Sequence, residues 1–212
     1  MVGVFITPAI LLTKNKERMT KVDKLIFGFG QNDLEGCSNT KAFSCWYNMI
    51  RRCYDPKFKI LKPTYSEAVV CEEWRLFSEF KKWFDENCKA GYENYVLDKD
   101  IISKGNKVYS PSTCCLVPSE VNAVLTKSDK QRGSFPIGVK PNKSKKRFEA
   151  RLSINKQYYH LGTYESPELA FIAYKAGKQA WIRKLAYEYY INGHISQRVY
   201  EALQNYQVEI SD

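Results

Sequence analysis

The sequence predicts an α+β fold, in which a helical and β-hairpin module precedes a three-stranded antiparallel sheet packed on a helix, with a further C-terminal helix. Apolar residues at helical spacing over 41–52 and 72–86 favour helices in the first half. Three short runs, 137–140, 147–154 and 157–163, favour strands in the second half. A composition of 44% hydrophobic and 14% aromatic residues is sufficient for a buried core.

The chain divides into four parts by composition. Residues 1–36 mix short apolar runs with Gly, Asn and charges, and we expect an N-terminal arm there. Residues 37–125 form the first module, and residues 126–134, which contain no apolar side chain, are typical of a linker. Residues 135–212 then form the sheet domain with its helical extension.

Within the first module, the two helices are expected to pack through aromatic side chains such as Trp46, Trp74 and Phe80. An apolar and acidic strand over 96–101 is followed by a Gly105-Asn106 turn, Val108-Tyr109 and the segment Cys114 to Val117, which together predict a β-hairpin. A short helix is predicted to open at 118–120.

In the second domain, the middle strand alternates apolar and polar residues, so one face of the sheet is apolar and the other polar. A helix with Ser166 as its N-cap and Pro167 at its first position is expected to cover the apolar face. The predicted apolar stripe of this helix includes Leu169, Ile172 and Ala173. The polar face is left open to a partner.

The charge distribution favours a polyanionic partner. The formal net charge is +10 with a pI of about 9.2, and residues 125–160 carry ten Lys and Arg against two Asp and Glu. No membrane partner is expected, because the apolar run over 4–12 is too short to span a bilayer.

Seven cysteines occur without a CxxC pair, which predicts reduced thiols and a cytoplasmic location. Buried free thiols behave as small hydrophobic side chains, and this is the interpretation we favour. A zinc site assembled from distant segments is the alternative, with Cys53, Cys71, Cys114 and Cys115 as its ligands.

The basic sheet predicts a duplex DNA interface in the major groove. Its open face and its first loop supply two groups of candidates. Base contacts are expected from Lys140, Arg151, Ser153, Tyr158 and His160, and phosphate contacts from Lys143, Lys145, Lys146 and Arg147. A solvated basic surface that touches no ligand is the alternative interpretation.

The segments Ile137-Gly138-Val139-Lys140, Arg147-Phe148-Glu149-Ala150-Arg151-Leu152, Tyr159-His160-Leu161-Gly162-Thr163-Tyr164 and Glu168-Leu169-Ala170 resemble the plant APETALA/ethylene-response-factor DNA-binding domain over about 50 residues. The resemblance implies binding of the sheet in the major groove. The chain departs from the pattern at Ser153 and His160, where the plant domains carry tryptophan and further arginines. Their DNA sequence preference therefore does not transfer.

The first module resembles phage-encoded proteins grouped with HNH homing endonucleases. The resemblance rests on five segments: 46–54, 70–74, 97–100, 109–114 and the Val117-Pro118…Val121-Asn122 motif. It implies Asp98 and Asp100 as metal ligands and Asn122 in the final position. Both histidines lie outside the module, Lys99 stands where a general base belongs, and Thr113 replaces an expected Asn.

We therefore expect a degenerate HNH-like module that binds duplex DNA without cutting it, needs no cofactor and is encoded by a phage acting in the cytoplasm of a bacterial host. One alternative is a metal-dependent homing-type endonuclease with an altered active site, formed by Asp98, Lys99, Asp100 and Asn122 and using Mg or Mn. Another is an interaction protein that binds a host factor. In the simplest interpretation, Asp98 and Asp100 only stabilise the hairpin.

Overall fold

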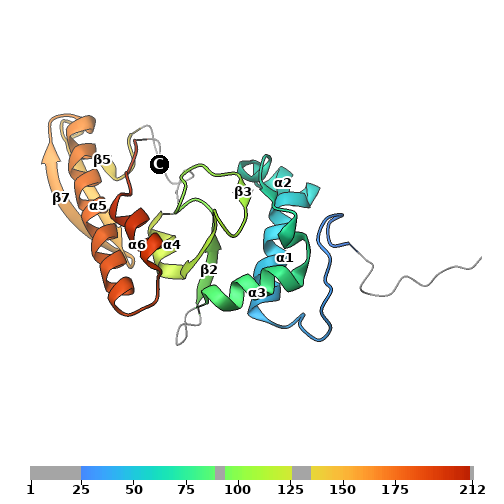
Figure 1. Ribbon diagram of the computed structural model, residues 1–212. Coiled ribbons are helices and arrows are strands. Elements are labelled where there is room, and N and C mark those ends of the chain that lie inside the picture. Colours follow the sequence, from blue (N-terminus) through green and yellow to red (C-terminus); the bar gives the residue numbers. More distant parts are fainter. Residues whose placement is uncertain (1–24, 89–93, 126–134, 211–212) are drawn as a thin grey trace, which may run out of the picture.

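The computed structural model of the chain describes residues 25–88, 94–125 and 135–210. The fold is α+β, as the sequence predicts, with helical and sheet elements in both halves (Figure 1). The expected linker over 126–134 and the first 24 residues of the expected arm lie outside the described residues.

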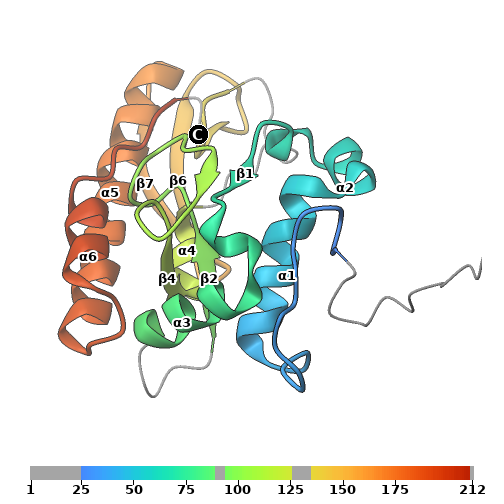
Figure 2. The same cartoon turned by 45° about the vertical axis from the view of Figure 1, so that its right-hand side comes forward.

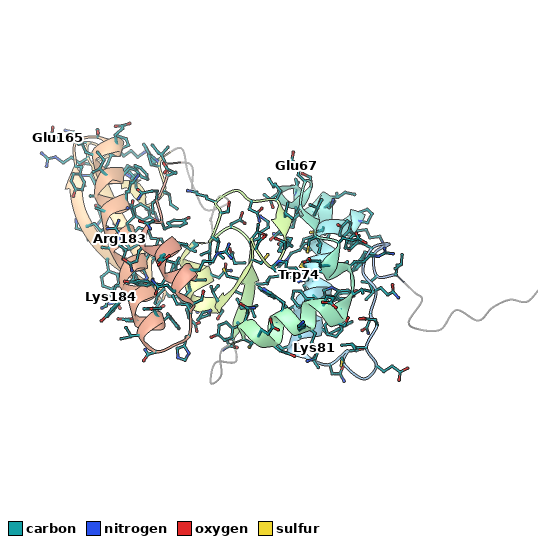
Figure 3. The ribbon with its side chains drawn as sticks, in the orientation of Figure 1. Glu67, Trp74, Lys81, Glu165, Arg183 and Lys184 are labelled. Atoms are coloured by element: carbon teal, nitrogen blue, oxygen red, sulfur yellow. The ribbon has the colours of Figure 1, made fainter. Side chains whose placement is uncertain are left out.

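The first hydrophobic core lies between α1 (Lys41–Tyr54) and α3 (Phe77–Asn87). Trp46 and Phe77 are fully buried there, and the Trp46 indole donates a 2.7 Å hydrogen bond to the carbonyl oxygen of Trp74. Figure 3 shows Trp74 next to α3, inside this part of the molecule. The aromatic packing predicted from the sequence is confirmed.

The helix expected over 72–86 is interrupted. A 3-10 turn, η3 (Glu73–Arg75), is followed by Leu76 in extended conformation, and α3 begins at Phe77. The backbone at Leu76 is extended because Gln31 of the lead-in segment pairs alongside it, exchanging hydrogen bonds with Arg75 and Phe77. Sequence periodicity alone did not reveal this break.

Two short elements connect α1 to the first strand. Asp55 accepts a hydrogen bond from the backbone of Lys57 and caps α2 (Pro56–Leu61), which is followed by η2 (Pro63–Tyr65). The strand β1 (Val69–Val70) comes next.

In the predicted hairpin, the 96–101 segment does not pair with Val108-Tyr109 across the Gly105-Asn106 turn. Strand β2 (Tyr95–Asp98) pairs antiparallel with β4 (Cys115–Pro118), whereas β3 (Val108–Tyr109) pairs in parallel with β1. The chain leaves the sheet at Asp98, because this carboxylate accepts hydrogen bonds from the backbone N–H groups of Asp100 and Ile101. The following helix, α4 (Ser119–Leu125), begins where predicted.

The second half contains the predicted three-stranded antiparallel sheet, in the order β5 (Val139–Pro141), β6 (Phe148–Ile154) and β7 (Gln157–Tyr164). The turn between β6 and β7 places Asn155 and Lys156 at positive φ, as a two-residue hairpin turn requires. Helix α5 (Pro167–Ile191) packs on the sheet, and α6 (Gln197–Gln204) packs on α5.

In the first turns of α5, the stripe that faces the core differs from the predicted one. Leu169 and Ile172 are 49% and 61% exposed, whereas Ala170 and Tyr174 are buried against the sheet. The Tyr174 ring fits against Gly138, where no larger residue leaves room. The most apolar side chains of this turn therefore do not mark the buried face.

A second core joins the two halves. Ile101, Cys115, Val117 and Val121 from the first module pack in one buried cluster with residues of the sheet, α5 and α6. The Tyr95 hydroxyl adds a 2.7 Å hydrogen bond to the carbonyl oxygen of His194. Accordingly, β4 and α4 lie between α1 and the α5–α6 pair in Figure 2. No helix in the described ranges is long and apolar enough to cross a membrane.

Candidate nucleic-acid interface

The open face of the three-stranded sheet brings together all five residues expected to contact bases. Arg151 is paired with His160 and Ser153 with Tyr158 across β6 and β7, and Lys140 lies opposite Glu149 across β5 and β6. Lys140, Arg151, Ser153, Tyr158 and His160 are all exposed. Because side chains alternate along a strand, these residues project from the face opposite α5.

A β-bulge in β7 maintains this face. Ala150 pairs with Gly162 while Arg151 pairs with His160, so Leu161 is the extra residue. Leu161 contacts Gly177 of α5, so both Leu161 and its neighbour Gly162 belong to the helix-facing side. The bulge thus lets His160 and Thr163 lie on the same open face.

Arg151 is not free on this face. Its guanidinium Nε donates a 2.9 Å hydrogen bond to Glu149 Oε2, and its Nη2 contacts the same carboxylate oxygen. The Glu149 side chain is 19% exposed and the Arg151 side chain 45% exposed. A base that receives Arg151 must therefore compete with Glu149, or be contacted by both side chains.

The loop between β5 and β6 is held in a defined shape by Asn142. Its side-chain oxygen accepts hydrogen bonds from Ser144 Oγ and from the backbone N–H groups of Lys146 and Arg147. Lys145 adopts positive φ at the apex. The loop therefore presents its cations from a formed turn.

Four exposed lysines lie on the open sheet face or in the loop beside it. Within the described parts of the chain, no acidic side chain forms an ion pair with Lys140, Lys143, Lys145 or Lys146, and all four are exposed. Arg147 differs, because its Nη2 lies 3.9 Å from Glu165 Oε1. Both partners of this pair are exposed, and such pairs contribute little to stability.

Three of the residues proposed for a nuclease site, Asp98, Lys99 and Asp100, form hydrogen bonds or ion pairs within their own segment. Asp98 Oδ1 is 2.7 Å from the backbone nitrogens of both Asp100 and Ile101. Burial is the main cause that raises the pKa of the Asp98 carboxyl above its usual value. Lys99 Nζ is bound to both Asp100 oxygens and to the carbonyl oxygen of Asn106.

Asp98, Lys99, Asp100 and Asn122 line one cleft. Thr113 lies apart from them, and its hydroxyl donates to the carbonyl oxygen of Val108. In the described ranges, no three His, Cys, Asp or Glu side chains are grouped closely enough to hold a metal ion. Asp98 accepts the hydrogen bonds that form the turn after β2, and Asp100 forms an ion pair with Lys99.

The four cysteines considered as zinc ligands are free thiols, and three of them are buried. Burial raises the pKa of Cys53 and Cys114 to about 12 and raises the pKa of Cys115 further. Such thiols are poor nucleophiles and poor sources of thiolate at neutral pH.

Sequence reasoning missed two sets of residues. Glu149 and Thr163 lie on the open sheet face, and strand alternation, extended to every polar position, could have included them. The second set lies on one side of α1 in the cleft: Lys41, Ser44, Asn48 and Arg52. Only the tertiary fold brings that side of α1 opposite β2.

Comparisons of the chain with protein-family models, with curated proteins and with solved structures found no match.

Proposed function

We propose that the protein binds duplex DNA, with the open face of the β5–β7 sheet in the major groove and the β5–β6 loop on the phosphate backbone. The observation that carries this proposal is a group of four exposed lysines, one on the polar sheet face and three in the adjoining loop, that have no acidic partner among the described residues. The resemblance to phage-encoded HNH-like proteins suggests that a phage or mobile element uses this binding. We further propose that the first module does not cut DNA.

The charges of this surface suggest that affinity and sequence preference come from different segments. The strand face itself carries Lys140 and Arg151 against Glu149, so it is only weakly positive. The adjoining loop carries Lys143, Lys145, Lys146 and Arg147 without an acidic residue between them. Affinity should therefore come mainly from the loop and sequence preference from the strands.

The salt dependence of binding tests the loop. Four phosphate contacts predict a slope of log affinity against log salt of roughly −3 to −4, measured by fluorescence anisotropy with a labelled duplex. Replacing Lys143, Lys145 and Lys146 by Ala should reduce the slope by about 2 to 3. Lys184→Ala removes one charge from α5, away from the Glu165 end of the helix (Figure 3), and should leave the slope unchanged.

Selection of sites from a random duplex library tests the strands. The wild-type protein should enrich a short motif, and Arg151→Ala should relax one position of it, at a cost of about 1 to 3 kcal/mol for the favoured base. Binding without any enriched motif would reduce the proposal to non-specific association. A flat salt response would remove it.

A supercoiled plasmid in EDTA, Mg²⁺ or Mn²⁺ tests the first module. Retarded mobility in every buffer, with no nicked or linear product, is the expected result. Metal-dependent cleavage that Asp98→Ala abolishes would instead establish a metal-dependent endonuclease with an altered active site.

A further inference from the structure

A cleft of about 310 Å³ lies between α1 and β2 in the first module. Its side walls come from one face of α1 and from the backbone and side chains of 95–100, with Tyr65, Tyr109 and Asn122 completing the lining. A volume of this size accommodates a phosphate group together with part of the molecule that carries it.

The polar lining from α1 follows from helical spacing. Lys41, Ser44, Asn48 and Arg52 occur at intervals of three or four residues, which places them on one face of the helix. The opposite face carries Trp46, Met49, Ile50 and Cys53 into the first core. The cleft is therefore built on a helix that the core holds in place.

Arg52 is the central feature of the cleft, because it is partly buried and has no acidic partner. Its guanidinium lies 5.8 Å from the centre of the Tyr65 ring, and Tyr109 lines the same cleft. In the described parts of the chain, Arg52 forms no ion pair. Its neighbour Arg51, by contrast, is exposed and pairs with Asp55.

The two carboxylates of the cleft do not compensate Arg52. Asp100 is held by Lys99 at 2.7 Å, which balances one charge against the other. Asp98 accepts two backbone N–H groups and is partly buried. Lys41 adds another cation at the exposed side of the cleft, so the cleft has a positive surplus.

We propose that this cleft binds a phosphoryl group, with Arg52 as its main ligand and Lys41, Ser44 and Asn48 as further donors. A partly buried cation without a counter-ion is costly, and a planar guanidinium suits the oxygen pair of a phosphate. The phosphoryl group comes either from the backbone of bound DNA, in which case this inference rests on the function proposed above, or from a small phosphate compound.

Inorganic phosphate is the probe for the site itself. Phosphate at ten times its dissociation constant should raise the thermal unfolding midpoint of the wild-type protein by about 3 to 6 °C relative to chloride of equal ionic strength. Arg52→Gln should lose this shift. Arg51→Gln is the matched control, because it removes the same charge one residue away from the cleft, and it should keep the shift.

Duplex DNA distinguishes the two sources. If the DNA backbone supplies the phosphate, Arg52→Gln should reduce the slope of log affinity against log salt by about 0.9, and Arg51→Gln should not. If Arg52→Gln loses the phosphate-induced rise of the thermal unfolding midpoint but keeps the slope of log affinity against log salt, the ligand is a small phosphate compound. If wild-type protein binds no duplex, the proposed function fails, while the phosphate experiment still tests the cleft.

Arg52→Lys separates charge from folding. It should restore part of the phosphate shift, because lysine keeps the cation but loses the bidentate geometry. Equal phosphate shifts in wild type, Arg52→Gln and Arg51→Gln would overturn the inference.

Discussion

Asp98 and Glu149 are acidic residues whose roles follow from their hydrogen bonds. Asp98 ends β2 by accepting two backbone N–H groups, and Glu149 holds Arg151 on the sheet face. Each can be tested by a substitution that keeps its shape and removes its charge.

Asp98→Asn should change how stability depends on pH. Burial raises the pKa of Asp98 in the folded state above the unfolded value of about 3.8, so the folded state holds the proton more tightly. The resulting stabilisation is fully present below pH 3.8 and is lost as pH rises through the folded-state pKa. Urea unfolding across pH 3 to 8 should show this loss in wild type relative to Asp98→Asn.

Asp98→Ala is the control for the turn. It removes both hydrogen bonds and should be roughly 1 to 2 kcal/mol less stable than Asp98→Asn at all pH values, because Asn keeps the accepting oxygen and neither variant titrates at this position. If the free energy of unfolding changes with pH in the same way in wild type and in Asp98→Asn, the pKa of Asp98 is not raised by folding.

Glu149→Gln should strengthen DNA binding. An exposed Arg–carboxylate pair stabilises by up to about 1 kcal/mol, and this must be given up when Arg151 moves to a base. Removing the charge should therefore raise affinity about two- to five-fold and alter the selected motif at the Arg151 position. Glu165→Gln, beside Arg147, should raise affinity without altering the motif.

At the scale of elements, the sequence predicts local structure better than pairing. The strands β6 and β7, the N-cap at Ser166 and the start of α4 could be predicted because alternation, capping and proline act within a few residues. The partner of β2 could not, because the choice between β3 and β4 depends on the turn formed by Asp98 and on burial of Val117.

Two glycines at positive φ allow the energetic cost of backbone strain to be distinguished from the cost of a packing clash. Gly138 and Gly105 have φ of +74° and +79°, but a Cβ at Gly138 would clash with the Tyr174 ring, whereas nothing lies within 4 Å at Gly105. Gly105→Ala should cost about 1 kcal/mol and Gly138→Ala roughly 3 kcal/mol or more, measured by urea unfolding. Equal costs would show that Tyr174 does not hold α5 against β5 at this point.

At the scale of the whole molecule, the cleft and the shared core arise from contacts that no local pattern reveals. Arg52 and Asp98 lie far apart in the sequence and line one cleft. Similarly, Val117 and Leu203 belong to one buried cluster although the expected linker lies between them. The candidate cleft could therefore be inferred only in part, through the resemblance that places Asp98 and Asn122 together.

The shared core predicts that both halves unfold together. Val117 is fully buried between them, so Val117→Ala should cost roughly 2 kcal/mol. Tryptophan fluorescence reports mainly on the first half, which holds Trp46, Trp74 and Trp83, whereas far-UV circular dichroism is sensitive to the 25-residue α5 of the second half. In the wild-type protein, the two signals should follow one urea transition. Val117→Ala should shift the midpoints of both signals equally. The control Val108→Ala, at a 38% exposed position, should shift neither midpoint appreciably. Separate transitions would show that the halves fold independently and that the buried cluster between them is a weak contact.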